Sequence, residues 1–178
     1  MKGISDNDLS KKIRRMVLTG LFFACAVILS LIENTIPLPV PAPGVKFGLS
    51  NIVVMYALFF LGKKEAILLA FLKSLFVFIT RGAIAGFLSL FGGLFSVLVM
   101  ISLIFVFKDK ISYLVVSIVG SIFHNIGQLI AVSLIYTNFL WIAYLPVLLI
   151  AGVLAGLATS TLLKVFIPAF KKVRFDID

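Results

Sequence analysis

Acidic residues and cysteine are scarce in this chain. Seven Asp and Glu residues stand against 16 Lys and Arg, and charged residues make up only 13% of the 178. Hydrophobic residues make up 62%, and the mean hydropathy is +1.22. A water-soluble fold of this size is excluded, because it could not bury so much apolar surface. The sequence therefore predicts an integral membrane protein.

Catalytic motifs are also lacking. Cys25 is the single cysteine, so no internal disulfide can form. We find no nucleophile–base pair, no cluster of metal ligands and no phosphate loop of the GxxxxGK[ST] kind. We therefore expect no catalytic residue, metal or cofactor, and any ATP-driven step would need partner proteins. The net charge of +9 does not indicate nucleic-acid binding, because the bases stand at the ends of apolar stretches.

Long hydrophobic runs dominate what is present. A spanning helix needs roughly 20 residues, so the second and third runs are short and lysines at their ends must reach towards the interface. The sequence predicts an all-α membrane domain of six transmembrane helices over 16–167, preceded by a basic segment 1–15 and followed by a tail 168–178. The apolar stretches lie at about 16–32, 48–61, 66–80, 84–107, 111–136 and 139–167.

The basic residues predict the orientation of these spans. If the N-terminus is cytoplasmic, 13 of the 16 bases lie inside, Lys46 and Arg81 lie outside, and Lys73 lies within a span. This asymmetry follows the positive-inside rule. It predicts two cytoplasmic termini in a multi-pass protein of a prokaryotic cell membrane.

Residues 32–51, IENTIPLPVPAPGVKFGLSN, interrupt the apolar runs with prolines at every second position from Pro37 to Pro43. Such spacing removes backbone donors and favours an extended, stiff conformation. The predicted orientation places the loop 33–47 outside the cell. It is either a plain rigid connector or a cover over a binding site, with Lys46 near its end.

Polar residues inside the spans gather beneath this segment. A charge at mid-span costs ~2.5–3.5 kcal/mol on insertion scales, so it needs a partner or a wet cavity. Lys73 could pair with Glu33, and His124 could bond to a neighbouring helix. We instead expect a cavity open to the outside that binds a small molecule. We expect this molecule to be anionic or amphipathic, because bases outnumber Glu33 and many Phe and Leu side chains surround them. The predicted binding residues are Glu33, Asn34, Lys46, Asn51, Lys73, Arg81, Ser89, His124, Asn125 and Gln128.

Small residues recur at helical spacing in three spans. Gly20 and Ala24 form one such pair, Gly152 and Gly156 another, and a third stripe runs through 86–96. Membrane helices approach closely through such residues, so each stripe predicts close packing or a docking face for another subunit. Gly20 and Ala24 are the docking candidates.

The loop motif, with LGKKEA at 61–66 and HNIGQ at 124–128, resembles the family called Gx transporter, also labelled heptaprenyl diphosphate synthase component I. That family is similar to the substrate-binding S components of energy-coupling factor (ECF) transporters. The resemblance implies a six-helix bundle whose first loop covers an outward-facing pocket. It also implies that a small-residue motif on the first helix, here Gly20 and Ala24, meets a transmembrane coupling subunit served by ATPases.

The enzyme label conflicts with the residues. Prenyl diphosphate synthases hold magnesium with DDxxD motifs, and this chain has none. The leading hypothesis is therefore a substrate-capture subunit of a transporter. The alternatives are a non-catalytic membrane subunit of an isoprenoid- or quinone-related enzyme, and a membrane anchor for a redox partner.

Overall fold

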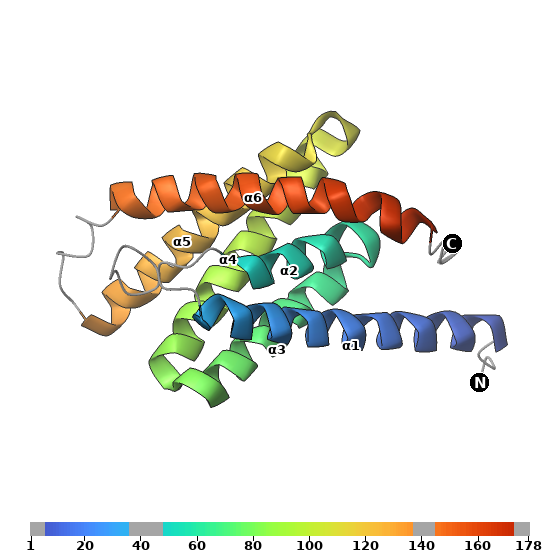
Figure 1. Cartoon of the computed structure of the whole chain (residues 1–178), viewed down its shortest axis with the longest axis horizontal. Coiled ribbons are helices and arrows are strands. Elements are labelled where there is room, and N and C mark those ends of the chain that lie inside the picture. The colour runs from blue at the N-terminus through green and yellow to red at the C-terminus, as the bar shows by residue number, and fades with distance from the viewer. Residues whose placement is uncertain (1–5, 36–47, 137–144, 173–178) are drawn as a thin grey trace.

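The computed structural model describes residues 6–35, 48–136 and 145–172, and all regular structure in these ranges is helical (Figure 1). Six α-helices and one short 3₁₀ turn follow one another along the chain. They are α1 (Asp6–Thr35), α2 (Leu49–Phe60), α3 (Lys63–Arg81), α4 (Ala83–Phe107), η1 (Lys108–Lys110), α5 (Tyr113–Tyr136) and α6 (Leu145–Lys172).

Four of these helices, α1, α4, α5 and α6, are long and apolar enough to cross a membrane. Their outward faces carry large apolar side chains, for example Met16 (71% exposed) and Phe105 (72% exposed). Side chains of this kind suit contact with lipid and would be costly in water. The chain is therefore a membrane-embedded helical protein, as predicted. Six complete spans and cytoplasmic termini remain predictions.

Both ends of the described chain lie at the same end of the bundle. Figure 1 shows the first turns of α1 and the last turns of α6 together, while the α3–α4 turn lies at the opposite end. Helix α1 begins at Asp6, so the described part of the basic segment is helical and continues directly into the first span. The α3–α4 turn is a single glycine, Gly82, at φ 90°.

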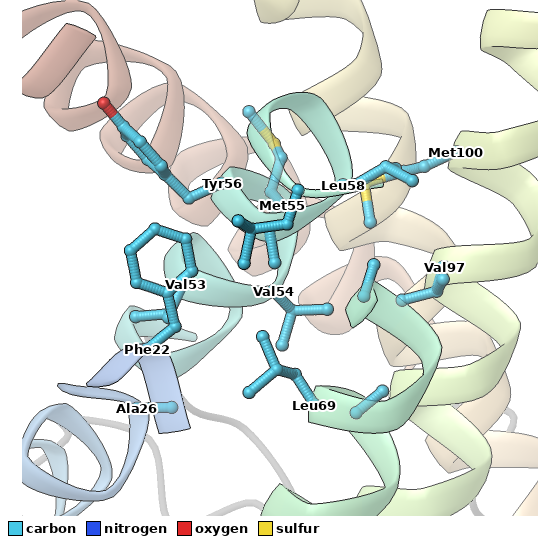
Figure 2. Close-up of a cluster of buried hydrophobic side chains, with 14 of the residues drawn as sticks. Phe22, Ala26, Val53, Val54, Met55, Tyr56, Leu58, Leu69, Val97 and Met100 are labelled. Atoms are coloured by element: carbon cyan, nitrogen blue, oxygen red, sulfur yellow. The ribbon is translucent and has the colours of Figure 1, made fainter. Parts of the chain in front are cut away.

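Helix α2 forms the centre of the hydrophobic core. It has 12 residues, and every side chain from Ile52 to Leu58 is buried. It packs against α1, α3, α4 and α6. In Figure 2, Val54 and Met55 of α2 lie among Phe22, Leu69 and Met100 from three other helices. A helix that is apolar on all sides fits such a central position.

Small residues let the remaining helices approach closely. A Cβ atom added at Gly156 would lie 2.5 Å from Ile118 Cα, and one at Gly152 would lie 3.1 Å from Ile122 Cα. The Ser117 hydroxyl also donates to the Gly156 carbonyl at 2.7 Å. The Gly152/Gly156 pair therefore serves close packing between α5 and α6. Gly20 differs, since an added Cβ there would meet nothing within 4 Å.

Candidate functional site

A polar pocket of about 360 Å³ opens at the end of the bundle where α1 ends and α2 begins. Five helices contribute to it, and this end is the predicted extracellular end. We call it the charged pocket. It is lined by Ser30, Glu33, Gly48, Ser50, Asn51, Lys73, Val77, Arg81, Ile84, Ala85, Leu88, Ser89, His124 and Gln128.

Seven of the ten residues predicted to bind substrate line this pocket. The structure does not bring Asn125 to it. The side chain of Asn34 and the whole of Lys46 lie outside the described residues. The seven are Glu33, Asn51, Lys73, Arg81, Ser89, His124 and Gln128.

Lys73 is the only lysine among the described residues that line the pocket, and it is 8% exposed. Its ammonium donates a hydrogen bond to the side-chain oxygen of Asn51, in the first turn of α2. That amide is neutral, so it satisfies one N–H of the ammonium without neutralising the charge. The Asn51 side chain thus positions the Lys73 ammonium at the pocket.

Glu33 is 6% exposed and lies in the last turn of α1. Its carboxylate accepts a hydrogen bond from the backbone N–H of Gly48, which stands just before α2. Gly48 has a left-handed conformation, φ 71°, which glycine adopts without strain. This contact joins the two ends of the segment that carries the prolines.

Arg81, at the end of α3, extends to α1 and donates to the Ser30 carbonyl at 3.3 Å. Neither Arg81 nor Lys73 forms an ion pair with Glu33 in the part of the chain that the structure describes. The pairing of Lys73 with Glu33 that the sequence left open is therefore not formed. Two bases and one acid give the pocket lining a net charge of +1.

His124 and Gln128 project from one face of α5, as their i, i+4 spacing predicts. They pack against Gly92 of α4, where an added Cβ would lie 2.9 Å from His124 Cε1 and 2.7 Å from Gln128 Cγ. His124 is 9% exposed, and its Nδ1 has no hydrogen-bond partner among the residues that the structure describes. A buried, unpartnered ring nitrogen costs free energy unless something binds it.

Asn125, the next residue along α5, has a structural partner. Its amide donates to the Leu148 carbonyl of α6 at 2.7 Å. Successive helical residues point about 100° apart, so His124 and Asn125 cannot face the same space. The Asn125 contact satisfies a carbonyl in the first turns of α6.

Sequence reasoning missed several lining residues. Ser30 and Ser50 are buried at 3% and 2% exposed, and Ile84, Ala85 and Leu88 supply the apolar part of the wall from α4. The serines had a usable signal, because Ser30 is three residues before Glu33 on one helix face and Ser50 precedes Asn51. The apolar residues had none, since their types match the lipid-facing positions of the same helix.

The predicted docking pair lies away from this pocket. Gly20 and Ala24 are both exposed on α1, beside the exposed Leu21 and Ile28. None of the described helices covers this face. It is therefore free to meet lipid or another membrane protein.

A family model described as heptaprenyl diphosphate synthase component I matches residues 22–166. The chain belongs to this family, which is the one that the sequence motifs resemble. The matched region contains every residue of the charged pocket. No curated protein and no solved structure gives a significant match.

Proposed function

We propose that this member of the heptaprenyl diphosphate synthase component I family is the substrate-binding membrane subunit of a transporter. It captures a small anionic molecule in the charged pocket and passes it inward. One observation supports this most directly: a bundle made mainly of hydrocarbon side chains contains a pocket with two bases, one acid and a histidine whose Nδ1 has no partner in the described part of the chain.

Structural packing alone does not account for these groups. Each charge placed within a membrane span costs free energy. A helix that served only for packing would be more stable without that charge. The hydrogen bonds of Lys73 and Arg81 are with an amide oxygen and a backbone carbonyl, which are neutral. The single Glu33 carboxylate acts on both bases without an ion pair among the described residues, so a net positive charge remains. A ligand that carries negative charge would supply the missing compensation.

The sign of the ligand follows from the lining. Lys73 and Arg81 outnumber Glu33, and charge attraction in a partly dry pocket is screened far less than in bulk water. The His124 ring nitrogen and the Gln128 amide add hydrogen-bonding groups from α5. We expect Lys46 to add a further positive charge from the proline segment.

Transport inward requires a motor that this chain lacks by sequence, so we expect a transmembrane coupling subunit and ATPases as partners. The resemblance to ECF S components supports this, and it assigns the covering role to residues 32–51. The exposed Gly20 and Ala24 on α1 suit close approach of a partner helix.

The family description favours a second candidate. It names a component of a prenyl diphosphate synthase, which agrees with a non-catalytic membrane subunit of an isoprenoid or quinone pathway enzyme. The absence of a DDxxD motif from the sequence still argues against catalysis by this chain. The two candidates differ in the protein that co-purifies with the chain, an ATPase module or a synthase.

Native mass spectrometry of the purified protein tests the proposal. We expect the wild type to carry a small retained molecule that is lost in Lys73→Gln. Lys64→Gln is the matched control, because Lys64 is exposed in the first turn of the same helix. Equal retention in both variants, or no retained molecule under conditions that keep the protein folded, would count against the charged pocket as the binding site.

A further inference from the structure

A second cavity, of about 500 Å³, lies on the lipid-facing side of α3 and α4. We call it the apolar groove. Phe71, Leu75 and Phe78 of α3 line it, and all three are about half exposed. Its single polar side chain, Ser74, donates its hydroxyl hydrogen to the Phe71 carbonyl at 2.7 Å. The groove therefore offers hydrocarbon contact only.

The charged pocket and the apolar groove share one residue, Ile84, in the first turn of α4. One turn or less beyond Ile84, away from the α3–α4 turn, α3 and α4 are in contact, because a Cβ at Gly86 would lie 2.6 Å from Phe78 Cβ. At the α3–α4 turn, none of the described atoms lies within 4 Å of a Cβ added at Gly82. Both spaces therefore border the side chain of Ile84, next to this turn.

We infer that the ligand is an anionic amphiphile, whose charged group lies beside Lys73 and Arg81 and whose hydrocarbon chain passes over Ile84 into the apolar groove. This inference rests on the proposed function and names its substrate class. Three observations support it: a net positive lining on one side, an apolar lining on the other, and a shared boundary residue that is itself apolar and 49% exposed.

The arrangement solves a physical problem for such a ligand. If the hydrocarbon chain of the ligand had to leave the bilayer to reach a water-filled opening, the affinity would fall about fourfold for each CH₂ group exposed to water. A path over Ile84 keeps the chain in hydrocarbon while the head enters the pocket. The groove spans eight residues of each helix, from Ala83 to Leu90 and from Phe78 to Phe71, a rise of about 10 Å.

Two phosphate monoesters test the inference, butyl phosphate and decyl phosphate. Their binding to the full chain in phosphatidylcholine nanodiscs is measured by calorimetry, with empty nanodiscs subtracted. We expect decyl phosphate to bind at least about tenfold more tightly, because its chain concentrates it in the bilayer and the groove accepts it there. In Ala83→Trp, which fills the groove from an exposed position, that preference is lost and butyl phosphate binding is unchanged.

Leu98→Trp is the control, because Leu98 is 53% exposed on α4 and lines neither cavity. It should keep the preference. If Ala83→Trp fails to fold, Leu75→Trp blocks the groove from α3. Equal binding of the two esters by the wild type, or a preference that survives the groove-filling variants, overturns the inference and leaves the charged pocket intact. Butyl phosphate binding that ignores Lys73→Gln, or no binding of either ester, contradicts the proposed function as well.

Discussion

The ammonium of Lys73 donates its hydrogen bond to the amide oxygen of Asn51 and forms no ion pair with the carboxylate of Glu33. Lys73 belongs to α3 and Asn51 to the first turn of α2, so this contact also fixes the entry of α2 into the core. It holds a base at the pocket without neutralising it. A pocket arranged in this way keeps its attraction for an anion before the anion arrives.

Replacing Asn51 tests how much this contact contributes to the stability of the fold. We expect Asn51→Ala to lower the free energy of unfolding by about 1.5–3 kcal/mol, because a hydrogen bond to a charged, buried group is lost. Reversible unfolding in mixed micelles measures the change. Ser102→Ala is the control, since that exposed hydroxyl donates only to a carbonyl of its own helix. An unchanged stability for Asn51→Ala would show that Lys73 is satisfied without it.

Gly92 and Gly93 are neighbours on α4, and replacing each by alanine tests how closely α4 packs against α5 beside the charged pocket. A Cβ at Gly92 would lie 2.9 Å from the His124 backbone oxygen, whereas one at Gly93 would lie 3.6 Å from Ala70 Cβ, an ordinary contact. We expect Gly92→Ala to cost about 1–3 kcal/mol by overpacking and to displace α5, and Gly93→Ala to cost little. Thermal unfolding followed by circular dichroism compares the two. Equal melting temperatures would contradict the close approach of α4 and α5 at His124.

His124 should matter for ligand retention more than for stability. Its Nδ1 has no partner within the described ranges, so His124→Ala removes no hydrogen bond between that atom and these residues. We expect the retained ligand to be lost or weakened in native mass spectra, while the protein stays folded by size-exclusion chromatography. Asn125→Ala should do the reverse, because its amide bonds to α6. If the two variants behave alike, the division between pocket and packing residues on α5 is wrong.

Two of the small-residue stripes, Gly152/Gly156 and Gly20/Ala24, should respond differently to a larger side chain. Gly156→Leu is expected to separate α5 from α6 and unfold the protein, since even a Cβ would lie 2.5 Å from Ile118 Cα. Replacing Gly20 and Ala24 by Leu should leave the isolated chain folded and its ligand bound, and weaken co-purification with a coupling subunit. Full co-purification of the double variant would show that this face of α1 meets lipid alone.

Cysteine labelling tests the predicted orientation. In a Cys25→Ala background, an impermeant reagent added to intact cells should label Ala42→Cys and should not label Asp109→Cys. The expectation follows from the distribution of the basic residues. The opposite labelling pattern would reverse the topology and place the charged pocket on the cytoplasmic side.

Much of the site could be predicted from sequence because polar groups are conspicuous in hydrocarbon. His124 and Lys73 each stand in an apolar run and Arg81 stands at the end of one, and their cost within a membrane made a shared pocket the simplest expectation. Their partners could not be predicted in the same way. Which side chain meets Lys73 depends on where the short helix α2 begins, and that placement is set by packing on four other helices.

The fold, too, could be predicted only in part. The apolar runs predicted helices. The helical start at Asp6 was missed because the residues before Met16 lack the apolar signal of the other helices, although their basic residues have good helix propensity. The burial of α2 was missed because an apolar helix sequence is equally compatible with contact to protein and with contact to lipid. Its shortness, 12 residues, was the usable signal.

The position of α2 has a consequence for the making of the protein. At 12 residues this helix extends about 18 Å, well short of a ~30 Å hydrocarbon layer, so it cannot insert as a stable span by itself. One of the helices that cover it, α6, follows α1 to α5 along the chain and therefore leaves the ribosome after them. The interior closes only after α6 has been made. A chain truncated before α6 would leave α2 partly uncovered, and we expect membrane quality control to degrade it.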